Sequence, residues 1–212
     1  MFLAARCPVC GHPVSDACVG CWSAALPAPT DATVPAAVAF VGAGRRLILG
    51  LKYGNGRTLA RPLAARMAPL VAGCSADIVT WAPTSGRRLR RRGYDQAELI
   101  ARALARELGL PCRPMLRRLS GSAAQTGRNR AERRAGAPRF VARRSWGPQR
   151  VLLVDDVVTT GATLRAAERA LRRAGCSEIF PVAGAATPDP GGARRSDTTS
   201  GRTRPGEGMV PR

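Results

Sequence analysis

Residues 151–163 read Val-Leu-Leu-Val-Asp-Asp-Val-Val-Thr-Thr-Gly-Ala-Thr, and this stretch decides the fold class. Its first four residues are a continuous run of valine and leucine, as expected of a strand that is buried on both faces of a parallel sheet. The adjacent carboxylates Asp155 and Asp156 follow, and a helical pattern over 162–174 begins after a short turn of threonine and glycine. The sequence therefore predicts polar residues at the carboxyl end of a central strand, where open α/β sheets bind their ligands.

The turn after this strand has the composition of a phosphate site. Backbone amides at the start of a helix, helped by the hydroxyls of Thr159, Thr160 and Thr163, form a cradle for an anion, and Gly161 lets the backbone come close to it. The two carboxylates would repel a phosphate in direct contact, but they can accept hydrogen bonds from sugar hydroxyls and support a magnesium ion through water. The residues thus predict a site for a phosphorylated sugar with Mg2+. An ordinary buried strand followed by a capped helix would explain the apolar run but not the whole string.

The rest of the chain alternates between strand and helix signals. Apolar runs that end at proline or glycine predict strands, and apolar residues three or four positions apart predict helices. The predicted elements are helices over 47–53 and 59–71 separated by a turn at 54–56, a buried strand at 77–83, an arginine-rich loop at 84–92, an amphipathic helix over 95–108, a short strand near 115–116, a surface loop at 120–139 and a strand at 179–183. This order is typical of an open, mainly parallel α/β sheet with right-handed crossovers.

Four of the seven cysteines form two Cys-x-x-Cys pairs, Cys7 with Cys10 and Cys18 with Cys21. Each pair can fold around one tetrahedral ion in a tight turn, so the pattern indicates a structural Zn2+ site with four thiolate ligands. His12, the only histidine, is a weaker candidate because the four cysteines already complete the coordination shell. No disulfide framework is expected, because the first residues lack the leader of a secretory signal. The other three cysteines are isolated, and we interpret them as small apolar core residues: Cys74, Cys112 and Cys176.

The chain is strongly basic. It carries 34 Lys and Arg residues against 14 Asp and Glu residues, a formal net charge of +20, which normally indicates a polyanionic partner. Lys52 is the only lysine, however, so the excess is an excess of arginine. Genome-wide base composition explains such a skew better than selection for one ligand, and a dedicated nucleic-acid surface does not follow. No apolar stretch approaches the ~20 residues of a membrane-spanning helix, and we expect a cytoplasmic protein without membrane insertion.

Residues 151–163 closely resemble the signature of type I phosphoribosyltransferases. In that family the acidic pair holds the ribose hydroxyls of phosphoribosyl pyrophosphate, and the following loop wraps its 5′-phosphate. The resemblance implies the type I phosphoribosyltransferase fold, an open, mainly parallel sheet flanked by helices. The residues that it assigns to phosphoribosyl pyrophosphate are Asp155, Asp156, Val158, Thr159, Thr160, Gly161, Ala162 and Thr163.

Joined to a small N-terminal four-cysteine module, this signature resembles the ComF family, the bacterial competence-associated proteins. Residues 51–53 resemble the early Lys-Tyr element of that family, and residues 92–96 resemble its Arg-Gly-Phe-Asn-Gln element. Gln125 and Arg130 stand at its mid-domain Gln and Arg positions. The resemblance spans residues 7–186. Together with the composition of the connecting segments, it predicts the following division of the chain: a zinc-binding cysteine module at 1–26, a linker at 27–36, a phosphoribosyltransferase domain at 37–186 and a disordered tail at 187–212.

The chain departs from the ComF pattern in two segments. Tyr94 and Asp95 stand in place of Phe and Asn, and residues 133–140 lack the Asn that precedes the Gly-Ala-Phe stretch. These departures concern the mobile loop and the acceptor pocket, and they leave the phosphate loop unaffected.

The arginine-rich loop lies where type I enzymes bind pyrophosphate. Thr84 and Arg88 are candidate ligands in this loop, and Arg92 is a candidate catalytic residue together with the acidic pair. The remaining arginines of the loop are expected to face water. Lys52 is a further candidate, because the single lysine of an arginine-rich chain can supply a compact point charge. The alternative is an ordinary lysine at the end of a helix.

Two functions agree with these expectations. The first is an enzyme that binds phosphoribosyl pyrophosphate with Mg2+ and transfers the phosphoribosyl group to an unidentified acceptor, with release of pyrophosphate through an oxocarbenium-like state. The second is a non-catalytic competence or DNA-uptake accessory that keeps the site as a ligand switch and engages single-stranded DNA or a helicase. An aromatic content of 4% argues against nonspecific strand binding, because such grooves combine charge with stacking platforms. A homodimer is left open.

Overall fold

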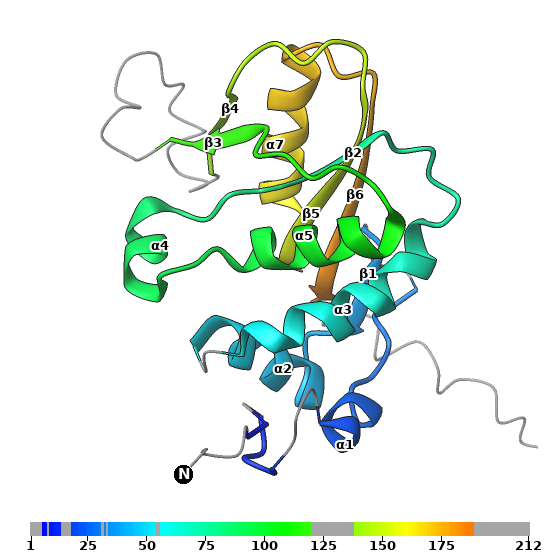
Figure 1. The fold of residues 1–212 in the computed structure, drawn as a ribbon, viewed down its shortest axis with the longest axis vertical. Coiled ribbons are helices and arrows are strands. Elements are labelled where there is room, and N and C mark those ends of the chain that lie inside the picture. The colour runs from blue at the N-terminus through cyan, green and yellow to red at the C-terminus, as the bar shows by residue number, and fades with distance from the viewer. Residues whose placement is uncertain are drawn as a thin grey trace, which may run out of the picture.

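The computed structural model describes residues 6–7, 9–13, 18–30, 32, 34–53, 56–119 and 138–188. Its elements, in chain order (Figure 1), are α1 (Val19–Ser23), β1 (Ala36–Ala39), α2 (Gly42–Tyr53), η1 (Arg57–Leu59), α3 (Ala60–Met67), η2 (Ala68–Val71), β2 (Ile78–Trp81), α4 (Gly86–Arg92), α5 (Gln96–Leu108), β3 (Leu116–Arg118), β4 (Phe140–Ala142), β5 (Arg150–Val158), α7 (Ala162–Arg173) and β6 (Glu178–Ala186). Some of the predicted features lie outside the described residues. They are the part of the predicted turn at residues 54–55, the part of the predicted surface loop at 120–137 with Gln125 and Arg130, and the part of the predicted tail at 189–212.

The main sheet has four parallel strands in the order β1-β6-β5-β2. β5 is an inner strand, which pairs with β2 along residues 151–154 and with β6 along residues 150–158. β3 and β4 form a separate antiparallel pair. The predicted open, parallel α/β sheet is therefore confirmed, with the motif-bearing strand in its interior.

β5 is longer than its apolar run. Residues 151–154 belong alternately to the two cores of the domain and are at most 1% exposed. Burying each such side chain stabilises the fold by about 1.5–3 kcal/mol, which favours an inner strand at this position. The strand continues through Asp155 and Asp156 to Val158. The acidic pair thus lies within the last part of the hydrogen-bonded strand, at the carboxyl end where the sequence predicts it.

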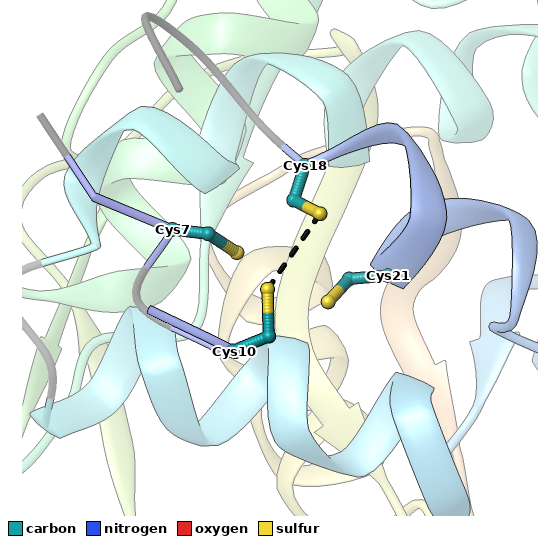
Figure 2. Close-up of side chains that lie close together, drawn as sticks. All are labelled: Cys7, Cys10, Cys18 and Cys21. Atoms are coloured by element: carbon teal, nitrogen blue, oxygen red, sulfur yellow. Dashed lines mark hydrogen bonds between the residues drawn. The ribbon is translucent and has the colours of Figure 1, made fainter. Parts of the chain in front are cut away.

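The N-terminal segment is a tight turn followed by α1. Backbone hydrogen bonds of 2.8 Å close the turn at residues 7–12. The sulfur atoms of the four cysteines, from this turn and from the start of α1, face one another (Figure 2). Trp22 of α1 is 6% exposed and packs into the same core as α2. Arg66 of α3 donates a hydrogen bond to the carbonyl oxygen of Trp22 at 3.0 Å, so this segment is attached to the domain through Trp22.

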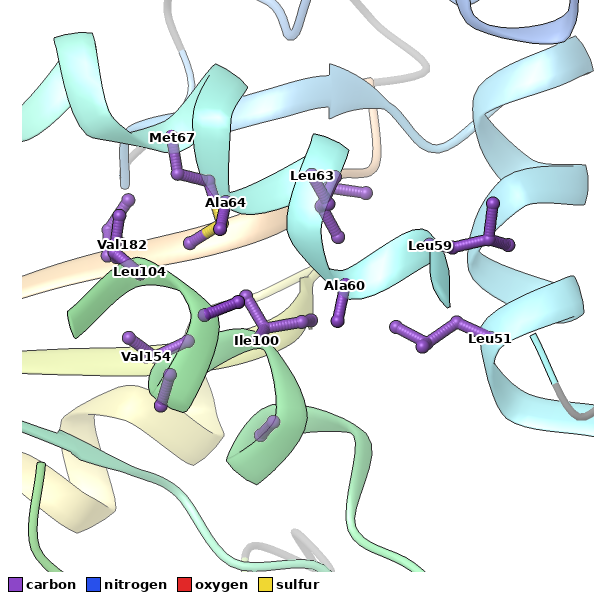
Figure 3. Packing of buried hydrophobic residues seen from close by; sticks show 14 of the residues in the cluster. Leu51, Leu59, Ala60, Leu63, Ala64, Met67, Ile100, Leu104, Val154 and Val182 are labelled. Carbon is purple, nitrogen blue, oxygen red and sulfur yellow. The ribbon is translucent and has the colours of Figure 1, made fainter. Parts of the chain in front are cut away.

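Helices cover both faces of the sheet. α2, α3 and α5 pack on one face of the sheet and α7 packs on the other (Figure 1). Because neither face of β5 meets solvent at residues 151–154, polar residues do not alternate with apolar ones there. The core under α3 and α5 includes Leu63, Met67, Ile100, Leu104, Val154 and Val182 (Figure 3). Of the three isolated cysteines, Cys176 is a core residue as predicted, whereas Cys74 and Cys112 are half-buried and pack against the core. Within the described ranges, no helix combines the length and the apolar character needed to cross a membrane.

Several elements differ from the sequence-based expectation, which also lacks α1 and β4. Residues 86–92 form the helix α4, where the sequence predicts a loop, and Ser85 caps this helix by accepting the N–H of Arg88 at 3.4 Å. None of the residues of α4 is buried, so it lacks the apolar stripe by which an amphipathic helix is recognised. β1 is not predicted, because its sequence Ala-Ala-Val-Ala has little β propensity of its own. It forms a strand because it pairs with β6.

Candidate functional site

A cavity of about 750 Å3 opens at the carboxyl ends of β2 and β5. The end of α2, the helix α4, the start of α5, β3 and the start of α7 form its other walls. The predicted site residues that line it are Lys52, Thr84, Arg88, Arg92, Asp155, Asp156, Thr159 and Thr163. The predicted site residues that do not line it are Val158, Thr160, Gly161 and Ala162. Among these four, Val158 is buried in the core under α7, and Thr160 is exposed.

The acidic pair meets a cation from a distant part of the chain. Lys52, in the last turn of α2, places its Nζ atom 2.9 Å from Oδ2 of Asp156. Asp155 is 8% exposed, and its Oδ1 atom accepts the N–H of Asp156 at 2.8 Å. Burial, and then the charge of Asp156, raise the pKa of Asp155 well above its ordinary value, whereas Lys52 opposes this shift. The pair thus joins a buried carboxyl group, Asp155, to one that is paired with a cation, Asp156.

Arg92 is held by two side chains. Its Nη1 atom donates to Oε1 of Gln96 and its Nη2 atom donates to the hydroxyl of Tyr53, both at 2.8 Å. The hydrogen bond from Arg92 lowers the pKa of Tyr53. Within the described part of the chain, Nε of Arg92 and Nε2 of Gln96 are buried and have no hydrogen-bond partner. A buried donor without an acceptor costs about 1–3 kcal/mol of folding free energy.

Asp95 is a site residue that sequence reasoning missed. It lines the cavity and is 7% exposed, and its two carboxylate oxygens accept the N–H groups of Thr84 at 2.8 Å and Ala97 at 3.1 Å. Burial raises the pKa of Asp95 to about 6, although the backbone hydrogen bonds oppose this rise. The preference for aspartate before the first residue of a helix is the sequence signal that points to it. Other polar residues of the cavity wall were also missed, among them Arg87 and Arg91, which the sequence analysis expected to face water: Tyr53, Arg87, Arg91, Gln96 and Arg118.

The turn between β5 and α7 has a backbone conformation that glycine favours. Gly161 is the N-cap residue of α7 with a φ angle of 70°, and no side chain caps this helix. The left-handed region costs other residues about 1–2 kcal/mol. Thr163, in the first turn of α7, lines the cavity. The first N–H groups of α7 are therefore not used by a side-chain cap, and the start of a helix attracts anions.

Comparison with known families agrees with this architecture. The sequence matches a family model described as phosphoribosyl transferase domain over residues 95–205, just over half of the chain. The chain belongs to the phosphoribosyltransferase family. The matched segment contains α5, β5 with its acidic pair, α7 and β6. The predicted fold class is confirmed, since the chain combines a parallel sheet flanked by helices with a four-cysteine cluster near the N-terminus.

Among curated proteins, this chain is 36% identical over 94 residues to Competence protein F of Haemophilus influenzae. The match covers 42% of this chain and 41% of that protein, so it spans less than half the length of the relative. The predicted resemblance to the ComF family is confirmed by this match. Similar solved structures include the glutamine phosphoribosylpyrophosphate amidotransferase of B. subtilis, which is 25% identical to this chain and has a TM-score of 0.42. This match covers 61% of this chain and 27% of that chain. The purine phosphoribosyltransferase of Pyrococcus horikoshii is 18% identical to this chain and has a TM-score of 0.39. This match covers 58% of this chain and 71% of that chain.

The N-terminal cysteines form a cluster outside the cavity of the phosphoribosyltransferase domain. The sulfur atoms of Cys7, Cys10, Cys18 and Cys21 all lie within 4.8 Å of one another, and those of Cys10 and Cys18 are 3.7 Å apart (Figure 2). Tetrahedral coordination with Zn–S bonds of about 2.3 Å places sulfur atoms about 3.8 Å apart. Four thiolates at this spacing repel one another and need a cation between them. The cluster is compatible with a structural zinc ion, and His12 is not among its members.

Proposed function

We propose that this chain binds phosphoribosyl pyrophosphate with magnesium and transfers the phosphoribosyl group to an acceptor, with release of pyrophosphate. The observation that carries the proposal is a single cavity with two chemically different walls, the acidic pair at the end of β5 and the arginines of α4. A phosphorylated sugar presents hydroxyl groups to the first wall and anionic oxygens to the second. The volume of about 750 Å3 lies within the range of about 300–1,000 Å3 typical of small-molecule sites. Membership in the phosphoribosyltransferase family supports the same ligand class.

Each part of the ligand has a complementary group in the chain. Asp155 and Asp156 would accept hydrogen bonds from the ribose hydroxyls. The turn at 158–163, with Gly161 at the start of α7, would hold the 5′-phosphate. The pyrophosphate group would lie against the segment that carries Thr84 and Arg88, near the charge of Lys52.

The arginines would act mainly as the reaction proceeds. Transfer breaks the bond between C1 of the ribose and an oxygen of the pyrophosphate, and it forms a bond between C1 and a nucleophilic atom of the acceptor. The electron pair of the broken bond leaves with pyrophosphate, so negative charge grows on that group. The guanidinium groups of Arg88 and Arg92 stabilise this charge more strongly in the transition state than in the bound substrate.

The cavity residues fit a magnesium ion. Mg2+ prefers oxygen ligands and commonly keeps several waters while it contacts one or two carboxylates and the phosphates of a substrate. Asp155 and Asp156 supply such carboxylates, and Lys52 occupies one oxygen of Asp156. Bound Mg2+ would neutralise part of the charge on the pyrophosphate group. For the cysteine cluster we propose one structural Zn2+ ion, held by Cys7, Cys10, Cys18 and Cys21.

A second function is favoured by the name of the relative, Competence protein F, and by the exposure of most of α4. In this function the cavity would serve as a ligand switch without catalysis, and the basic surface would bind single-stranded DNA or a helicase. The exposed arginines of α4 are Arg87, Arg88, Arg90 and Arg91.

Calorimetric titration with phosphoribosyl pyrophosphate, with and without Mg2+, followed by pyrophosphate-release assays with a panel of bases and amines, separates the two functions. Binding with turnover supports transfer, and binding without turnover on every acceptor supports the ligand switch. Absence of binding in the presence of Mg2+ refutes both. Asp156→Asn should weaken binding about tenfold or more, because the hydroxyl partners lose a charged acceptor. The matched control is Asp77→Asn, since Asp77 pairs with Arg150 at the amino end of the sheet.

A further inference from the structure

Helix α4 carries arginines of the cavity but has no buried residue of its own. Leu89, its one large apolar residue, is 42% exposed. A helix that is held by apolar burial has a stripe of residues facing the core, and α4 lacks such a stripe. Its orientation must therefore come from contacts of its flanking residues and from polar contacts such as those of Arg92.

Both flanks of α4 meet at Asp95. Thr84, just before α4, donates its N–H to Oδ2 of Asp95 at 2.8 Å. Ala97, in the first turn of α5, donates its N–H to Oδ1 at 3.1 Å. One buried carboxylate thus joins the segment that enters α4 to the helix that follows it. We name this pair of hydrogen bonds the Asp95 clasp.

We propose that Asp95 is a positioning residue whose clasp sets where Thr84 and the arginines of α4 meet a pyrophosphate group. The inference rests on the proposed function, because that function assigns pyrophosphate to this segment. Asp95 does not itself bind the pyrophosphate, since both of its oxygens are occupied by backbone N–H groups and its charge would repel the ligand.

The clasp requires the ionised form of Asp95. A carboxylate accepts hydrogen bonds at both oxygens, whereas a protonated carboxyl or an amide places a donor against one of the two N–H groups. The pKa of Asp95 is raised by burial to about 6, so the clasp is complete at neutral pH and weakens as the pH falls through that value. Asp155 and Asp156 on β5 disfavour the charge of Asp95, and Arg118 on β3 favours it. The other charged groups at the cavity wall are Lys52 of α2 and Arg87, Arg88, Arg91 and Arg92 of α4.

Global stability is the wrong readout for this effect. Because the pKa of Asp95 is raised from 3.8, the folded state binds the proton more tightly than the unfolded state, and this group lowers stability as the pH rises from 3.8 to about 6. The clasp hydrogen bonds change in the opposite direction. Local hydrogen exchange separates the two effects, because it reports the opening of a single N–H group.

Amide hydrogen exchange of the ligand-free wild-type chain, followed by NMR, tests the clasp without a substitution. Protection of the Thr84 amide, corrected for the intrinsic exchange rate, should fall between about pH 7.5 and about pH 5. The Arg150 amide is the internal control, because it also donates to a carboxylate, Oδ2 of Asp77, at 2.9 Å. The pKa of Asp77 is lowered to about 2 by Arg150, so that carboxylate stays ionised throughout. Equal protection of Thr84 at both pH values would overturn the clasp.

Calorimetric titration of Asp95→Asn with pyrophosphate and with ribose 5-phosphate then tests positioning. Pyrophosphate affinity should fall about tenfold at neutral pH while ribose 5-phosphate affinity is unchanged, and the difference from wild type should shrink as the pH falls below 6. Asp77→Asn should bind both ligands as the wild type does. Unchanged pyrophosphate binding by Asp95→Asn, or an equal loss of both ligands, overturns positioning. A wild-type chain that shows the pH-dependent Thr84 protection but binds no pyrophosphate supports the clasp and refutes the proposed function.

Discussion

Replacement of Gly161 by valine should abolish binding of the 5′-phosphate. Gly161 is buried and holds a φ angle of 70° at the start of α7. An L residue in this conformation costs about 1–2 kcal/mol, and a β-branched residue tolerates it least. Relaxation to a negative φ angle would turn the first N–H groups of α7 away from the ligand. A hydrogen bond to a charged group contributes about 1.5–3 kcal/mol, so the loss of one bond weakens binding about tenfold to about 150-fold.

The assay for this variant is calorimetric titration with ribose 5-phosphate, which lacks the pyrophosphate group. Gly109→Val is the matched control, because Gly109 ends α5 with a φ angle of 66° and lies outside the turn between β5 and α7. Both variants should lose about 2–4 °C in Tm for each kcal/mol of backbone strain, but only Gly161→Val should lose the ligand. If Gly161→Val bound ribose 5-phosphate as tightly as the wild type, the phosphate site would lie elsewhere and the reasoning would be refuted.

Three further predictions concern metal, charge and nucleic acid. The purified chain should contain one zinc ion, and Cys7→Ser or Cys18→Ser should release it and destabilise the N-terminal segment; zinc-free protein of normal stability would contradict the assignment. Lys52→Met should raise the pKa of Asp155 further, because the cation that opposes the shift is removed, and an unchanged carboxyl titration by NMR would show that the ion pair is unimportant. Binding of oligonucleotides should be weak, insensitive to sequence and steeply reduced by salt, so tight and salt-resistant binding of single strands would reveal a dedicated surface.

The features that can be predicted from the sequence are those with a local cause. The apolar run at 151–154 predicts an inner strand, because only a strand covered on both faces buries every side chain of such a run. The helix over 96–108 follows from the spacing of its apolar residues. The paired cysteines Cys7–Cys10 and Cys18–Cys21 predict a cluster, because each pair is brought together by its own short turn.

The features that only the tertiary structure decided are contacts between distant segments. Lys52 meets Asp156 because α2 packs against the sheet, and no local pattern around either residue predicts this ion pair. β1 consists mainly of alanine and is a strand because β6 supplies its hydrogen-bond partners. Asp95 gains its role when Thr84 and Ala97 bring their N–H groups to it and when the surrounding elements bury it. Local sequence sets backbone preference over a few residues, whereas ion pairing, burial and the resulting pKa depend on how the elements pack together.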